Sequence, residues 1–116
     1  MTIRGKPAFR KERRRRIRRY LAMPAGIKSS FKHGIAELCD LSELGCRLDN
    51  VDIALELGNR ILIKPPKSES FLGTVKWVSK GQAGIEFDEA LQSASVENFC
   101  RMYPDSKSDV QLDVAA

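Results

Sequence analysis

Long hydrophobic runs are absent from this chain of 116 residues. Even the longest apolar stretches are short, such as residues 61–63, so no segment is long enough to cross a bilayer. The basic N-terminus has no apolar stretch behind it, which excludes a secretory signal. With 42% hydrophobic residues the chain can still bury a core, and its length fits one small domain. These features predict a cytoplasmic domain that is not associated with a membrane.

Cysteine and histidine are scarce as well. The three cysteines, Cys39, Cys46 and Cys100, are odd in number and lack a paired spacing, so they do not form a disulfide framework. Cys39 and Cys46 fall in strand patterns, where a small buried apolar side chain is the common role. His33 is the only histidine, which leaves a metal cluster and a histidine-activated nucleophile unsupported. A P-loop is missing too, so we predict no enzyme, no metal and no cofactor.

The charge of the chain is concentrated at one end. The first twenty residues hold ten Arg and Lys against Glu12, a balance of +9, and the rest of the chain holds ten basic and fourteen acidic residues, a balance of −4. Such a basic arm repels itself and seeks an anion. Nucleic acid, an anionic membrane, a phosphorylated small molecule and the acidic body itself all meet this requirement, as does a solvated tail without a specific ligand.

Turn residues divide the chain before Phe87 into short segments with strand patterns. The segments 73–77 and 83–87 both alternate, and a polar, glycine-containing link joins them as an antiparallel hairpin. Val75 and Trp77 share one face of the first segment, and we expect Trp77 and Phe87 to point inward. The other expected strands are 25–29, 34–41, 46–48 and 59–64.

A helical period follows the last strand. The apolar residues at this spacing are Val96, Phe99, Cys100 and Tyr103. Ser93 or Ser95 is expected to cap the helix, and Pro104 to end it. The fold class is therefore mostly β, a small six-stranded antiparallel β-barrel with a C-terminal α-helix against one opening. The expected parts are a flexible basic arm over 1–20, the barrel with its helix over 21–104, and a disordered tail over 105–116.

Two stretches stand out as carriers of chemistry. The first is the arginine-rich run 13–19, since a guanidinium grips phosphate oxygens, matches the O6 and N7 edge of guanine and stacks on a purine. In the second, Asp40 ends a strand, Ser42 opens a turn and Gly45 permits a backbone conformation denied to other residues. Asp40 can accept hydrogen bonds from guanine and Ser42 can donate to a phosphate. Alternatively, the two residues only close the turn.

Together the two stretches resemble the PilZ domain, the bacterial receptor module for cyclic di-GMP. That family has an RxxxR motif near the start of a small split β-barrel, followed later by D/N-x-S-x-x-G. Asp40, Ser42 and Gly45 match the second motif at every required position. The segment 73–78 running into 84–87 is similar to the closing strands of the family, so the resemblance covers nearly the whole folded part.

The arginine run satisfies RxxxR in two registers. One pairs Arg14 with Arg18, with Arg13 as the preceding basic neighbour, and the other pairs Arg15 with Arg19. The distance to the following proline favours the first register. The ligand-binding residues implied by the resemblance are therefore Arg13, Arg14, Arg18, Asp40, Ser42 and Gly45, with Arg15 and Arg19 as the alternative register.

The resemblance implies a stand-alone receptor and adaptor. Cyclic di-GMP carries two phosphates and two guanines, and its binding would fold the mobile arm over the barrel mouth and order a surface for an unidentified downstream protein. We expect the free protein to be a monomer. Two alternatives are a PilZ-like protein-interaction module that binds no nucleotide and a nonspecific nucleic-acid binder that uses the arm. The acidic body and the inward-pointing aromatic side chains argue against nucleic acid.

Overall fold

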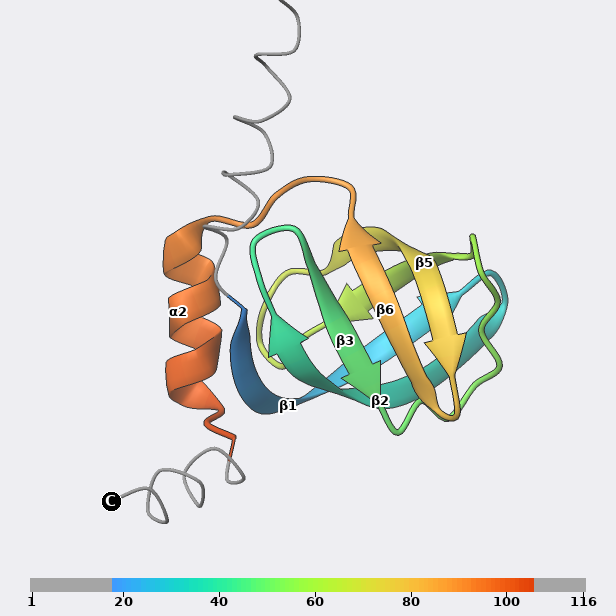
Figure 1. Cartoon of the computed structure of the whole chain (residues 1–116), viewed down its shortest axis with the longest axis horizontal. Helices are drawn as coiled ribbons and strands as arrows, with labels where there is room; N and C mark the ends of the chain where they lie inside the picture. The colour runs from blue at the N-terminus through green and yellow to red at the C-terminus, as the bar shows by residue number, and fades with distance from the viewer. Residues whose placement is uncertain (1–17, 106–116) are drawn as a thin grey trace, which may run out of the picture.

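The structure, a computed structural model, describes residues 18–105 and consists of a six-stranded antiparallel barrel with one helix (Figure 1). The barrel closes in the strand order β1-β2-β3-β6-β5-β4. Its elements are β1 (Arg19–Ser29), β2 (Lys32–Leu41), β3 (Gly45–Asp49), β4 (Arg60–Lys64), β5 (Phe71–Ser79), β6 (Gln82–Phe87) and the helix α2 (Ser93–Met102). The predicted fold class is confirmed.

Alternation of apolar side chains places the core inside the barrel. Along β1 the side chains of Leu21, Met23, Ala25 and Ile27 are buried, and the residues between them are half-buried or exposed. Successive side chains of a strand point to opposite faces, so this pattern assigns one face to the interior. β1 pairs with β2 along one edge and, through Gly26, Ile27 and Lys28, with β4 along the other, which closes the barrel.

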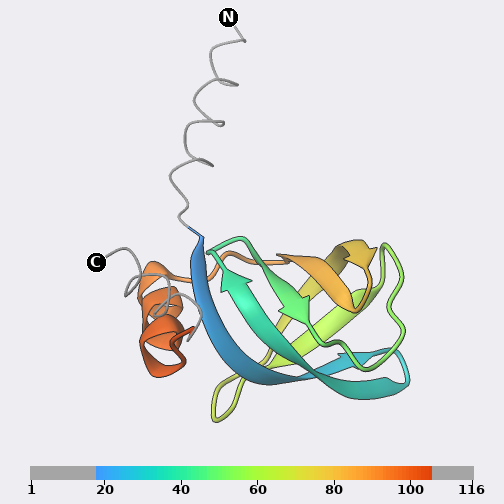
Figure 2. The ribbon, with the colours of Figure 1, turned by 60° about the horizontal axis from the view of Figure 1, so that its bottom comes forward.

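Helix α2 lies beside the first residues of β1 in both views of the ribbon (Figures 1 and 2). The Ala22 N–H donates to the Tyr103 carbonyl at 3.0 Å, and Val96 is the buried residue of the helix. The expected serine cap is wrong, because Ser93 is already helical. The N-cap is Gln92, whose backbone carbonyl accepts from Ser95 N–H at 2.9 Å, and no side-chain cap bond forms.

Trp77 does not point inward, so this prediction is wrong. Val75 pairs with Ile85, but Trp77 pairs with Gly84, so β5 advances by two residues while β6 advances by one. Such a bulge turns the following side chain to the other face of the sheet. Trp77 is 42% exposed, whereas Phe87 is buried as expected.

The first strand is longer than its pattern indicates. β1 begins at Arg19, so it includes the last two residues of the expected arm, Arg19 and Tyr20, which pair with β2. Residues 1–17 and 106–116 lie outside the described part, so the flexible arm and the disordered tail stay predictions. Within residues 18–105, no helix is long and apolar enough to cross a membrane.

Candidate functional site

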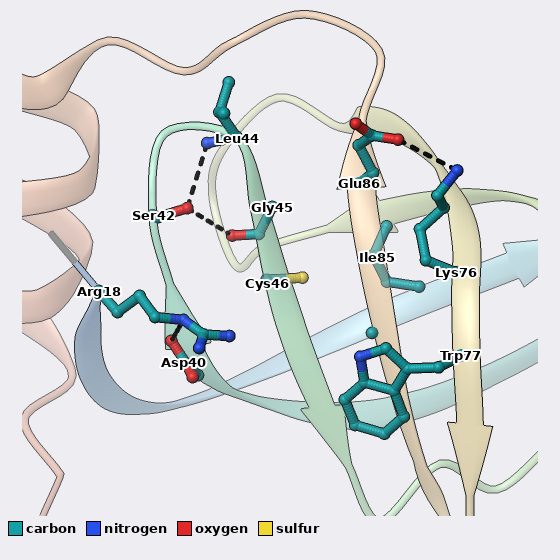
Figure 3. A pocket seen from close by; sticks show the side chains of 11 residues that line it. Arg18, Asp40, Ser42, Leu44, Gly45, Cys46, Lys76, Trp77, Ile85 and Glu86 are labelled. Carbon is teal, nitrogen blue, oxygen red and sulfur yellow. Dashed lines mark hydrogen bonds and ion pairs between the residues drawn. The ribbon is translucent and has the colours of Figure 1, made fainter. Parts of the chain in front are cut away.

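A pocket of about 330 Å³ lies on the outer side of the barrel, next to the point where the chain enters β1 (Figure 3). One wall comes from Arg18, the end of β2 and the turn into β3, and the other comes from β5 and β6. Its lining residues are Arg18, Asp40, Ser42, Leu44, Gly45, Cys46, Lys76, Trp77, Gly84, Ile85 and Glu86. Four of the residues singled out from the sequence therefore lie together.

Arg18 and Asp40 form an ion pair at the edge of this pocket. The Arg18 Nε lies 3.5 Å from Asp40 Oδ1, and the side chain of Arg18 is 69% exposed whereas that of Asp40 is 7% exposed. A buried carboxylate is costly unless a cation or hydrogen-bond donors compensate for the lost water. Asp40 is thus the buried partner of the pair, and Arg18 is the partner that faces solvent.

Ser42 closes the turn between β2 and β3. Its Oγ accepts from the Leu44 N–H at 3.2 Å, and its own N–H donates to the Gly45 carbonyl at 2.9 Å. The hydroxyl also lies 3.4 Å from the Gly45 carbonyl oxygen, which is long for a hydrogen bond from a hydroxyl. The turn role is therefore present, and the hydroxyl proton is held only weakly.

Gly45 is needed for a reason other than the one expected. Among residues 18–105, the glycines with positive φ are Gly58 and Gly81, so Gly45 does not use a left-handed backbone. Instead, a Cβ at position 45 would overlap the Ile85 carbonyl oxygen of β6. The glycine lets β3 and β6 approach closely at the pocket, and the expected conformational reason is wrong.

The wall formed by β5 and β6 is not predicted from the sequence. The Trp77 indole lies so close to Gly84 that a Cβ at position 84 would overlap its Nε1. Beside it, Lys76 Nζ lies 3.4 Å from Glu86 Oε1 (Figure 3). This wall adds an aromatic face, a cation and a carboxylate to the site. The glycine opposite the tryptophan is the sequence feature that could have indicated it.

The two adjacent arginines at the start of the described chain point to different partners. Arg18 lines the pocket, whereas Arg19 Nη2 lies 3.3 Å from Glu97 Oε2 on α2 and does not line it. Neighbouring residues of a strand project to opposite sides, which explains the separation. The other arginines singled out from the sequence lie outside the described residues: Arg13, Arg14 and Arg15.

The thiols near the site are not poised for nucleophilic chemistry. Cys46 is buried, as predicted, and burial raises its pKa above the ordinary value. Cys39 is only half-buried; its partial burial, with the charges of Asp49 and Glu37, raises its pKa to about 12. Both groups are protonated at neutral pH, and a thiol is a far weaker nucleophile than a thiolate.

Comparison with known proteins supports the fold. No protein-family model and no curated protein matches the chain. Among solved structures, the chain is similar to the Bacillus subtilis Inhibitor of motility (MotI/DgrA), with a TM-score of 0.61 and 14% identity. The match covers 78% of this chain and 50% of the Bacillus protein, so the chain spans about half the length of that protein. At this identity the likeness concerns the fold alone, and it supports the closed barrel described above.

Proposed function

We propose that this chain is a cyclic di-GMP receptor that closes its basic arm over the pocket and signals to a partner protein. One observation carries the proposal: Arg18, Asp40 and Ser42, which come from two separate motifs, line one pocket. Arg18 directly precedes β1, so the arm is attached at the edge of the site. A ligand with two phosphates supplies the anion that the arm requires.

The chemistry of the pocket matches a guanine nucleotide. The exposed guanidinium of Arg18 can pair with a phosphate or with guanine O6 and N7, and the carboxylate of Asp40 can accept from guanine N1 and N2. The exposed face of Trp77 can stack on the base. A volume of about 330 Å³ is at the lower end for small-molecule sites, so the arm would cover the rest of the dinucleotide.

The placement of the two arginines supports one register of the RxxxR motif. Arg18 lines the pocket beside Asp40, whereas Arg19 contacts Glu97 on α2 and does not line the pocket. We therefore infer that Arg14 acts with Arg18, and that Arg13 extends the same cluster. The pair Arg15 and Arg19 would have to break the contact with α2 before it could reach the pocket.

A regulatory role fits the comparison better than catalysis. The structurally similar Bacillus protein is an inhibitor of motility by its name, and it shares the barrel with this chain. We propose a cytoplasmic monomer that recruits a downstream protein once the arm is ordered.

Calorimetric titration with cyclic di-GMP, GTP and cyclic di-AMP tests the proposal. We expect cyclic di-GMP to bind most tightly, because cyclic di-AMP lacks the guanine N1 and N2 donors that Asp40 would accept from, and GTP carries one guanine instead of two. Arg18→Ala should weaken binding by about ten- to a hundredfold, the range for hydrogen bonds to charged groups. Arg19→Ala, its matched neighbour, should retain binding. Equal affinity for the three nucleotides, or unchanged affinity in Arg18→Ala, would overturn the proposal.

Nucleic-acid binding is a second candidate, and the exposed Trp77 favours it. The absence of an aromatic platform was an argument against this function, and the structure removes that argument. However, within residues 18–105 Trp77 is the only aromatic residue that lines the pocket, and proteins that bind single strands without sequence preference stack successive bases on several aromatic side chains. A titration with single-stranded oligonucleotide across a salt series separates the two, since a nonspecific clamp weakens steeply with salt.

A further inference from the structure

We propose that a groove across β1 and the β4–β5 loop binds an acidic peptide segment of a partner protein that carries an apolar side chain. The groove has a volume of about 360 Å³ and is separate from the pocket of Arg18. Its walls are apolar and its rim is basic. The apolar lining residues are Pro24, Ala25, Gly26, Ile35, Ala36, Pro65 and Pro66, and the basic ones are Lys64 and Lys67.

Gly26 forms a hollow that the barrel itself does not require. Four other glycines in strands are fixed by packing, since an added Cβ would overlap a neighbouring atom at Gly34, Gly45, Gly73 and Gly84. A Cβ at Gly26 would meet nothing nearer than Lys64 Cβ at 3.9 Å, which is an ordinary contact, and its φ is not positive. A glycine within a strand is costly and often marks the close approach of another molecule.

Ile35 is presented to solvent from a rigid part of the sheet. It pairs with Gly26, and its N–H donates to Asp52 Oδ1 at 2.8 Å, so its backbone is held from both sides. Nevertheless its side chain is 65% exposed. A large exposed apolar side chain beside a hollow is typical of a binding surface.

The charge of the groove selects the occupant. None of its lining residues, all of them within 18–105, is acidic. Lys28 lies on the same face, two residues beyond Gly26, and the acidic neighbours are Glu37, paired with Pro24, and Asp52, whose carboxylate is engaged with the Ile35 N–H. Lysine side chains at the rim attract carboxylates of a partner, and this charge complementarity affects the orientation and the association rate of the partner. An acidic segment with an apolar anchor therefore fits better than a basic or a neutral one.

The β4–β5 loop is fastened so that it forms one wall. The Lys64 ammonium donates to the carbonyls of Pro65 and Ser68, which ties the loop to the end of β4. Lys67, at the rim, adopts a left-handed backbone with φ of 54°, which is uncommon for a residue with a Cβ. Such a conformation costs stability in a residue other than glycine, and yet the residue at this position beside the groove is a lysine.

A peptide-display selection on the full chain, without nucleotide, tests this inference apart from the proposed function. We expect the retained peptides to carry Asp or Glu around a Leu, Ile, Val or Phe. Their affinity should fall about tenfold or more for Gly26→Leu, whose side chain fills the hollow. Circular dichroism should show that this barrel is intact, because a Cβ at position 26 would make only ordinary contacts with Lys64.

Lys67→Gly provides a second variant that should not harm folding, since glycine suits the positive φ. We expect weaker binding of the same peptides with unchanged or higher thermal stability. Lys80→Gly is the matched control, because Lys80 also has a left-handed backbone, with φ of 45°, but does not line the groove. It should leave peptide affinity unchanged.

Several results would overturn the inference. These are retention of neutral or basic peptides only, no enrichment at all, or equal affinity of the unmodified chain and Gly26→Leu for the retained peptides. Binding to phosphatidylserine vesicles that depends on Lys67 but not on the hollow would assign the surface to a membrane. Loss of a dimer in Gly26→Leu, measured by sedimentation, would assign it to a second copy of the chain.

Discussion

The pocket at Arg18 and the groove at Gly26 are built in opposite ways. Charged side chains from separate segments meet in the pocket, and its glycines are required by the close approach of β3, β5 and β6. The groove is an apolar depression whose glycine the fold does not require. A glycine in a strand can thus allow two strands to pack closely, or it can leave a hollow at the surface. The two cases are distinguished by the atoms that a Cβ at that position would contact.

The largest difference should appear when the same substitution is made at both glycines. Gly45→Ala places a methyl group against the Ile85 carbonyl oxygen and should lower the free energy of unfolding by about 1–3 kcal/mol, the usual cost of overpacking. Gly26→Ala should raise it by about 0.5 kcal/mol, because alanine loses less conformational entropy on folding. Urea denaturation of both variants measures the two values. Destabilisation of equal size would contradict the distinction.

Asp40 should matter for the pocket and not for the groove. Asp40→Ala removes the buried acceptor, and we expect cyclic di-GMP binding to weaken by about ten- to a hundredfold. Asp40→Asn should retain part of the affinity, since an amide oxygen still accepts. Asp49→Ala is the control, because Asp49 pairs with Arg47 outside the pocket. If Asp49→Ala lost as much affinity as Asp40→Ala, the assignment of the pocket would be wrong.

Trp77 should contribute to the binding free energy through stacking, to about the same extent as Asp40. We expect Trp77→Ala to lose about 1–3 kcal/mol, the range for stacking of a base on an aromatic side chain. Leu72→Ala, an exposed apolar residue away from the pocket, should lose none. The chain has a single tryptophan, so quenching of its fluorescence by cyclic di-GMP gives an independent measurement. No quenching at saturating ligand would rule out stacking on Trp77.

The smallest effect is expected at an ion pair that belongs to neither site. Arg60 donates to both carboxylate oxygens of Asp88, at 2.8 and 2.6 Å, and these hydrogen bonds lower the pKa of Asp88. A carboxyl whose pKa is lowered by folding adds stability above its ordinary pKa and loses it as the pH falls through the lowered value. Asp88→Asn should therefore show a weaker acid dependence of its melting temperature. An unchanged profile would contradict the contribution of this pair.

Much of the fold and four of the eleven residues that line the pocket could be predicted from the sequence. The alternation along the strands and the helical spacing after Phe87 are patterns of residues close together in the sequence. They therefore predict strands and a helix without knowledge of the fold. Asp40, Ser42 and Gly45 lie in one short segment, and Arg18 was found because arginine repeats at a fixed spacing. The structure confirms the barrel and places these four residues together.

The rest depends on contacts between distant strands. The bulge that exposes Trp77 arises from the pairing of β5 with β6, and alternation in a single strand predicts the opposite face. The need for Gly45 arises from Ile85, which is forty residues further along the chain. The groove at Gly26 exists because the β4–β5 loop is held by Lys64, and no local pattern indicates that contact.

Amide chemical shifts during a titration with cyclic di-GMP test the central claim most directly, because they report on both regions at once. The account predicts that the amides of Asp40, Ser42 and Gly45 and the Trp77 indole N–H shift and saturate together. The amides of Gly26 and Ile35 should stay unchanged. Shifts centred on Gly26 and Ile35, or no shift around Asp40 at saturating ligand, would contradict it.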